Sequence, residues 1–257
     1  VVPGSDAELA DMLQAELKKQ KISVRTSTVL SDPVLDEMGG GVAVTLSREG
    51  ASTVERFDKI LLAVGRKPRS RGIADETLGL VIDKRGFVEV DDQLQTGIPG
   101  VYACGDLIGQ PLLAHKASHE AMAIARKIAT GEPVTRHPVP GAVFTFPEFA
   151  SIGLTESQAR ERYEQIRVGR FAYAAGSRSN AIDEKNGLVK VISDENGVLV
   201  GAHILGAEAG ELMPLLNYAV TRKLKADEFR DLITIHPTLS ENVWEAVAQI
   251  GGFSVHG

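Results

Sequence analysis

Residues 188–205, LVKVISDENGVLVGAHIL, hold the strongest short-range fold signal in the chain. Two β-rich runs, 188–193 and 198–205, flank Asn196-Gly197, and an Asn-Gly pair between such runs is typical of a tight β-hairpin. Apolar residues then recur at helical spacing, at Leu212, Leu215, Leu216, Ala219 and Val220, and a further helix is expected to begin near Leu239. Strands followed by helices in this order predict an α+β domain.

The first part of the chain has a different pattern. Asp6 precedes leucines at 3–4 spacing, which predicts a helix over residues 7–20 with Asp6 as its N-cap. Strands are expected over residues 22–30, 42–46 and 54–57. The apolar run 60–64 does not alternate, so we expect a strand covered on both faces, as in a parallel sheet.

The middle of the chain contains connections and one long helix. A short strand is expected over 101–103, then a helix over 112–130 that ends at Gly131. The proline-containing stretch 135–141 is predicted to be a linker.

Composition limits the class of protein. The 257 residues are 43% hydrophobic and 24% charged, which is ordinary for a globular chain of two-domain length. The formal net charge of -6 argues against nucleic-acid binding, which needs a basic face. No run approaches the roughly 20 apolar residues that span a bilayer, and the first residues do not resemble a signal peptide. We therefore expect no nucleic-acid or membrane partner and a cytoplasmic location.

Cys104 is the only cysteine in the sequence, so the chain cannot form an internal disulfide. Because it ends an apolar run, we expect it to be a small, buried side chain. Dithiol redox chemistry cannot come from these residues alone.

The segment Thr234-Ile235-His236-Pro237-Thr238-Leu239-Ser240-Glu241 places an imidazole and a carboxylate five residues apart. One interpretation is a general base with its orienting acid, since an imidazole ordinarily has a pKa of about 6.5. The other is structural: Thr238 and Glu241 form a capping box that starts the last helix, and His236 is merely exposed before it. Taken alone, these residues favour the structural interpretation.

A second group of candidate residues lies around Gly105-Asp106, at the end of the strand expected over 101–103. Ligands collect at the carboxyl ends of strands in open α/β sheets, although Gly-Asp is also a common turn. The helix expected from Leu112 offers unpaired N–H groups and a positive dipole end to an electron-rich ligand. His115 and His119 are spaced i, i+4, but no third ligand is evident nearby, so we expect no metal site.

Three motifs together resemble one enzyme family. Gly100-Val101-Tyr102-Ala103-Cys104-Gly105-Asp106, Leu112-Leu113-Ala114-His115-Lys116-Ala117 and the His236 segment are similar, in order and wording, to the C-terminal portion of the flavoprotein disulfide reductases. Among these reductases, the motifs most resemble those of the dihydrolipoamide dehydrogenases. Complete members also carry an FAD-binding glycine-rich loop, a C-x4-C disulfide and a second glycine-rich loop for NAD, and none of these occurs here.

The resemblance implies a fragment with three parts. Residues 1–92 would be the C-terminal part of an NAD-binding domain, 93–134 the C-terminal part of an FAD-binding domain, and 135–257 an interface, or dimerisation, domain. The fold class expected is thus an α/β fragment, part of three-layer NAD- and FAD-binding domains, followed by an α+β dimerisation domain.

It also implies roles for individual residues. Asp106 would bind the FAD ribitol, Gly65 would lie beside NAD, and the start of the helix would face the flavin pyrimidine edge through Leu112, Leu113, Ala114 and His115. His236 would be the catalytic base and Glu241 its acid partner, reaching the active site of the other subunit of a homodimer. FAD and NAD are expected for the full-length parent, and FAD retention by this chain is left open.

The resemblance leaves the substrate open. The parent is expected to oxidise dihydrolipoamide within a lipoyl-bearing 2-oxo-acid dehydrogenase complex. Thr234 departs from the His common at this position in lipoamide dehydrogenases, which keeps a glutathione-reductase-like parent as an alternative. A mercuric-reductase-like parent is a further alternative, and the absence of a Cys-Cys pair before Gly257 weighs against it. A different reading is that the isolated chain is a dimerising module without turnover.

Overall fold

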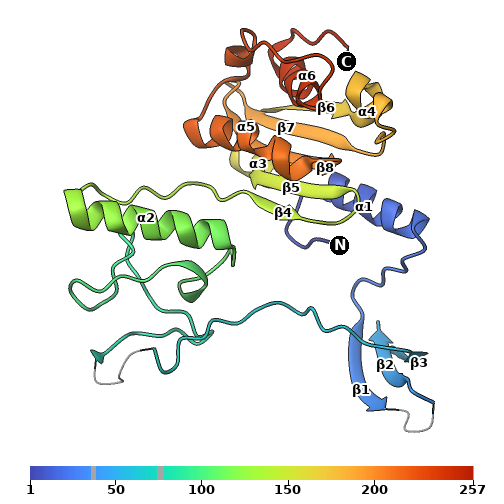
Figure 1. Ribbon diagram of the computed structural model, residues 1–257, viewed down its shortest axis with the longest axis vertical. Coiled ribbons are helices and arrows are strands. Elements are labelled where there is room, and N and C mark those ends of the chain that lie inside the picture. The colour runs from blue at the N-terminus through green and yellow to red at the C-terminus, as the bar shows by residue number, and fades with distance from the viewer. Residues whose placement is uncertain (36–38, 74–77, 257) are drawn as a thin grey trace.

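The computed structural model describes residues 1–35, 39–73 and 78–256. Within these ranges it contains two antiparallel sheets, joined by a long irregular stretch and a helix (Figure 1). The first sheet has the order β1-β2-β3, from strands Val29–Leu35, Val42–Arg48 and Ala51–Phe57. The second has the order β4-β5-β8-β7-β6, from strands Gly141–Val143, Glu148–Gly153, Leu199–Gly206, Leu188–Asp194 and Ile166–Ala172.

Several local predictions in the first part are confirmed. Helix α1 (Ala7–Lys19) occupies the predicted 7–20 segment, and β2 and β3 form the predicted pair. The strand predicted over 22–30 is wrong over residues 22–28, because β1 begins at Val29, opposite Ser47. Only Arg48 of β2 lies beyond that pair, so in the described part of the chain residues 22–27 have no strand opposite them with which to pair.

The buried strand predicted over residues 60–64 is also wrong. These residues form no regular element, and Leu61 and Val64 are 90% and 92% exposed. Among the described residues no strand pairs with this run and no helix covers it. A buried parallel strand needs a neighbouring strand and a covering helix, so apolar character alone does not make residues 60–64 a strand.

The middle of the chain follows the predictions more closely. The strand predicted over 101–103 is reduced to one bridge, between Gln95 and Tyr102. Helix α2 (Ala114–Thr130) begins two residues later than predicted and ends at Gly131, whose φ of +77° is the left-handed conformation that glycine favours. The linker predicted over 135–141 is confirmed except at Gly141, where β4 begins, and residues 131–140 form no regular element.

The predicted hairpin is formed by β7 and β8. Asp194 Oδ1 accepts hydrogen bonds from the N–H groups of Asn196 and Val198, and Gly197 adopts a φ of +79°. The helices of this part are α3 (Glu156–Arg162), α4 (Ser177–Ala181), α5 (Ala209–Arg222) and α6 (Ser240–Gly251). The predicted α+β domain is therefore present.

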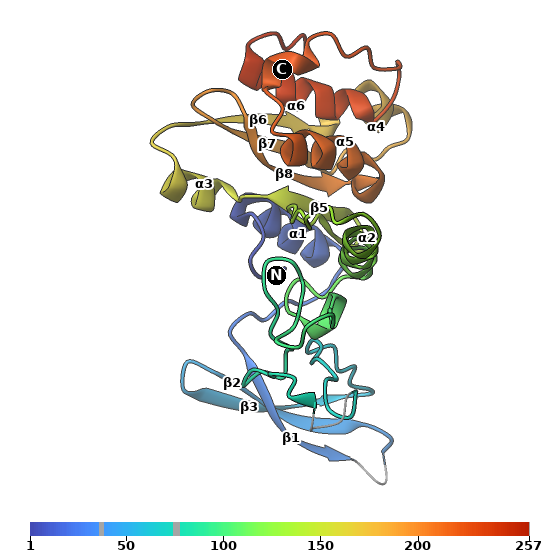
Figure 2. The same ribbon diagram turned by 90° about the vertical axis from the view of Figure 1, so that its left-hand side faces the viewer.

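Both faces of the five-stranded sheet are covered (Figure 2). Val189 and Val191 of β7 face the main core with α5 and α6, whereas Leu188 faces a smaller core with Leu9 and Leu13 of α1. Because side chains alternate along a strand, Lys190 points to the same face as Leu188. Burial on both faces explains why β7 does not alternate apolar and polar residues.

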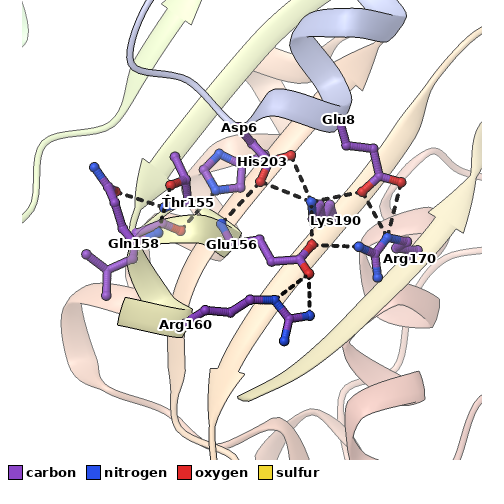
Figure 3. Close-up of polar contacts among 10 residues, drawn as sticks. Asp6, Glu8, Thr155, Glu156, Gln158, Arg160, Arg170, Lys190 and His203 are labelled. Atoms are coloured by element: carbon purple, nitrogen blue, oxygen red, sulfur yellow. Dashed lines mark hydrogen bonds and ion pairs between the residues drawn. The ribbon is translucent and has the colours of Figure 1, made fainter. Parts of the chain in front are cut away.

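Lys190 lies at the centre of a buried ionic cluster (Figure 3). Its ammonium is 2.8 Å from carboxylate oxygens of Asp6, Glu8 and Glu156, and its side chain is 2% exposed. Arg170 of β6 bridges Glu8 and Glu156. The cluster fastens α1 and α3 to the same face of the sheet.

The cluster corrects the role predicted for Asp6. Asp6 precedes α1 but makes no side-chain capping bond; it accepts instead from Lys190 and from the N–H of Glu156. Beside it, the ring of His203 donates from Nε2 to the carbonyl of Leu154, while Nδ1 has no partner among the described residues. Burial lowers the pKa of His203, so the ring is neutral near pH 7.

No helix within the described ranges is both long enough and apolar enough to cross a bilayer.

Replacing Lys190 with Met should destabilise the domain by about 3–5 kcal/mol, since three carboxylates would lose their buried cation. Urea unfolding at pH 7 measures this. Lys185→Met is the matched control: its pair with Asp183 is solvent-exposed, so a loss below about 1 kcal/mol is expected. Equal losses in the two variants would contradict the role given to Lys190.

The cluster should also make stability depend on acidity. Burial opposes ionisation of Glu156, but Lys190 and Arg160 overcome it and lower its pKa from 4.5 to about 2. A lowered folded-state pKa adds stability that is complete above the unfolded value and is lost as pH falls towards 2. The urea midpoint should fall between about pH 5 and about pH 3, and Glu156→Gln should flatten this fall. The exposed Glu164→Gln serves as control, and an unchanged slope in Glu156→Gln would count against the assignment.

Candidate functional site

His236 and Glu241 meet at the start of α6. His236 Nδ1 lies 2.9 Å from Glu241 Oε1, and the other carboxylate oxygen accepts the N–H of Thr238 at 2.8 Å. The Thr238 hydroxyl donates to the carbonyl of Ile235 rather than capping the helix. Half of the predicted capping box is therefore present, and the same glutamate also holds the imidazole.

The two interpretations of this segment are thus compatible. Glu241 has two oxygens, one for the backbone at the helix start and one for the ring. Its side chain is 24% exposed, whereas that of His236 is 68% exposed. The ring is held by its acid partner on one side and is open to solvent on the other.

The electrostatics favour a charged carboxylate. Partial burial opposes ionisation of Glu241, but the Thr238 N–H and the His236 ring outweigh it, so the pKa of Glu241 lies below its ordinary value. A carboxylate only accepts hydrogen bonds, so Nδ1 of a neutral His236 must carry the proton. Nε2 then bears the lone pair and has no partner among the described residues.

Asp106 and the Gly65 segment are brought together by an ion pair. Asp106 lies in the short helix Gly105–Leu107, and its carboxylate is 3.5 Å from Nε of Arg66, the residue after Gly65. Gly65 has a φ of +104°, and a Cβ there would meet nothing within 4 Å. Asp106 keeps an exposed carboxylate that can accept hydrogen bonds from hydroxyl groups.

The start of α2 lies close to this turn. Leu112 and Leu113 already donate their N–H groups, to Gln110 and Pro111 respectively. The first i→i−4 bond of α2 runs from Ala117 N–H to the carbonyl of Leu113, so the N–H groups before it have no partner within the helix. The His115 ring donates from Nε2 to the carbonyl of Pro140 at 2.7 Å. Ala114 is exposed, so its backbone is accessible to a ligand.

Cys104 is only partly buried, in contrast to the predicted buried position. Burial and the nearby carboxylate of Glu120 raise the pKa of its thiol, which therefore stays protonated near neutral pH. Among the described residues, no group of three or more His, Cys, Asp or Glu side chains is arranged to hold a metal ion.

The predicted residues form two separate groups. The dyad lies at the start of α6, in the domain built on the five-stranded sheet, whereas Gly65, Asp106 and the start of α2 belong to the segment between β3 and β4 (Figure 1). A cavity of about 880 Å³ between α2, the linker and α5 is lined by Leu113 and His115, but not by Asp106 or His236. Within the described residues, no hydrogen bond or ion pair joins the two groups.

Comparison with known proteins places the chain in a family. Residues 1–121 match the family described as pyridine nucleotide-disulphide oxidoreductase, and residues 139–247 match its dimerisation domain. The chain belongs to the pyridine nucleotide-disulphide oxidoreductases, the flavoprotein disulfide reductase family. The predicted fold class, an α/β part followed by an α+β dimerisation domain, is confirmed.

Individual relatives agree with this placement. The chain is 36% identical to a dihydrolipoyl dehydrogenase of Thermus scotoductus over 100% of its own length and 56% of the relative. It is 34% identical to the Bacillus subtilis dihydrolipoyl dehydrogenase, of which it covers 55%. A solved flavoprotein disulfide reductase from Escherichia coli, RclA, superposes with a TM-score of 0.84 at 26% identity, over 96% of this chain and 56% of that one. The chain spans about half the length of the relatives it matches.

Sequence reasoning missed the residues that support these groups. Arg66, which pairs with Asp106, and Glu120, which accepts the N–H of Gly105, were not predicted to contribute. Lys116 and Glu120 are four residues apart on α2 and lie near its apolar positions. The signal available in the sequence was a lysine and a glutamate at i, i+4 spacing beside apolar positions, a spacing at which opposite charges can pair on a helix.

The tautomer of His236 can be tested directly. At about pH 9, where a free imidazole is neutral, long-range ¹H–¹⁵N spectra should show His236 protonated at Nδ1. Glu241→Ala should abolish this preference, because it removes the only acceptor near that nitrogen among the described residues. His119 provides the internal control, and an Nε2-protonated His236 in the unmodified chain would contradict the geometry.

Proposed function

We propose that the chain is the C-terminal portion of a dihydrolipoamide dehydrogenase, with His236 and Glu241 as its catalytic dyad. The observation that carries the proposal is the 2.9 Å contact between His236 Nδ1 and Glu241, which leaves Nε2 free on an exposed ring. That arrangement suits proton abstraction from a thiol. Relatives named dihydrolipoyl dehydrogenase support the substrate class.

In this proposal Nε2 accepts the proton of a substrate thiol and Glu241 stabilises the resulting imidazolium. The thiolate would then attack an enzyme disulfide that lies outside these 257 residues, since Cys104 is the only cysteine here. Because Glu241 is ionised and holds one tautomer, the ring needs no rearrangement before it takes the proton.

The residues around Asp106 suit a flavin. A carboxylate that is still accessible can accept ribityl hydroxyl hydrogens, and the first N–H groups of α2 can donate to a pyrimidine carbonyl. Gly105 lies so close to α2 that a Cβ would be 2.8 Å from Ala117 Cβ, which keeps the turn against the helix start. FAD, when bound, passes the electron pair from the dithiol to NAD. Gly65 offers open space for close approach of the nicotinamide nucleotide.

We further propose that the parent is a homodimer in which the dyad serves the partner subunit. Ile233 and Ile235, next to His236, are 93% and 77% exposed, and exposed apolar side chains beside a functional group favour an interface. The family match to a dimerisation domain over residues 139–247 supports the same arrangement. The domain division 1–92, 93–134 and 135–257 belongs to this proposal.

The partner of the parent is inferred from the relatives, and its location from the sequence. A lipoyl-bearing 2-oxo-acid dehydrogenase complex is proposed as the partner of the parent. The cytoplasmic location stays a prediction, because matching relatives include mitochondrial proteins of Arabidopsis thaliana and Pisum sativum.

Two alternatives are kept because specific observations favour them. Thr234 departs from the lipoamide dehydrogenase pattern, and one relative, from Glycine max, is named leghemoglobin reductase, so another acceptor or disulfide substrate is the first alternative. The second is a non-catalytic dimerising chain, favoured by coverage of about half of each relative and by the single cysteine.

The test of the first proposal uses the full-length parent. His236→Ala should lower NAD-dependent oxidation of dihydrolipoamide by about 100- to 10,000-fold, the usual contribution of a positioned base. His119→Ala, on the exposed part of α2, should leave the rate within about twofold. An active His236→Ala enzyme would remove the dyad from the mechanism. NADH formation by residues 1–257 alone would exclude the non-catalytic alternative.

A further inference from the structure

Lys116 is the one buried residue of α2, at 8% exposure, in a helix whose other residues are partly or wholly exposed. A buried ammonium is stable only if its hydrogen-bonding capacity is met. Lys116 Nζ donates to the carbonyl oxygens of Gly105 and Gly109, each at 3.2 Å, and to Glu120 at 3.2–3.3 Å. All three N–H donors of the ammonium therefore have acceptors.

Glu120, one turn further along α2, completes the contact. Its Oε2 accepts the N–H of Gly105 at 2.7 Å while the carboxylate also pairs with Lys116. The Lys116–Glu120 pair thus binds the N–H and the C=O of Gly105 at one end of the turn, and the C=O of Gly109 at the other. Asp106 follows Gly105 directly, so the backbone on which its carboxylate is mounted is fixed at both ends.

The turn has little room to adjust. Gly105 has a φ of +73°, and a Cβ there would meet Ala117, the neighbour of Lys116 in α2, at 2.8 Å. The partly exposed carboxylate of Asp106 lies 3.5 Å from Nε of Arg66. Lys116 and Glu120 bond to the backbone of the turn, whereas the Asp106 carboxylate pairs with Arg66.

We propose that the Lys116–Glu120 pair positions Asp106 for flavin binding, an inference that rests on the proposed flavin role of Asp106. Lys116 and Glu120 are positioning residues, because their contacts are with the turn. A buried ion pair is not needed for stability alone, since apolar residues of similar volume often fill such a site equally well. A single cation is needed, however, to draw two backbone carbonyls and a carboxylate to one point.

The test measures FAD affinity of the full-length parent, stripped of flavin and titrated by flavin fluorescence. Lys116→Met and Asp106→Asn should each weaken FAD binding about tenfold or more, the effect of losing hydrogen bonds to a charged group. The double variant should have the same FAD affinity as the single variant that binds FAD less tightly, because both changes act through the same carboxylate. Lys127→Met is the matched control: this lysine lies on the same helix but bonds to Gln93, away from the turn.

Each outcome decides one of two claims. Unchanged FAD affinity in Lys116→Met, or losses that simply add in the double variant, would overturn the positioning role while the flavin role of Asp106 stands. Unchanged affinity in Asp106→Asn would overturn the flavin role itself, and the inference with it. If Lys116→Met does not yield folded protein, Glu120→Gln keeps an acceptor for Gly105 N–H but weakens the pair, and it should show a smaller loss with the same non-additivity.

Discussion

One buried cation joins the start of α1 to the five-stranded sheet. Lys190 lies on β7, the first strand of the hairpin, and two of the carboxylates around it, Asp6 and Glu8, lie at the start of α1. Burying an ammonium costs free energy, so Lys190 is stable in the strand only when the carboxylates surround it in the folded protein. The apolar contacts of Leu9 and Leu13 with the same face of the sheet add to this attachment. The direction in which the chain leaves α1, towards the first sheet, therefore depends on a residue far along the sequence.

The elements predicted correctly from the sequence are those that depend on residues close together along the chain. The hairpin at Asn196-Gly197 and the helices α1 and α2 were found because turn chemistry and apolar spacing are local properties. The run 60–64 was misjudged because a strand is completed by partners, which no local pattern contains. Lys190 and Asp6 are 184 residues apart, so neither residue type nor spacing could have paired them.

The candidate site divides in the same way. His236 and Glu241 are five residues apart across a helix start, and their contact followed from spacing together with the family resemblance. The link between Arg66 and Asp106 spans forty residues and joins an irregular segment to a short helix, so it required the fold. Roles for flavin and nicotinamide came from resemblance, whereas the geometry added the supporting residues beneath the Asp106 turn.

Glu241 has a consequence for the motions of α6. Because one carboxylate holds both the N–H of Thr238 and the ring of His236, the order of the first helical turn and the orientation of the imidazole are not independent. Fraying of that turn would release the carboxylate and leave the ring free to rotate. Contacts that cover Ile233 and Ile235 would oppose such fraying, so assembly could raise the fraction of molecules with an aligned base without touching the base itself.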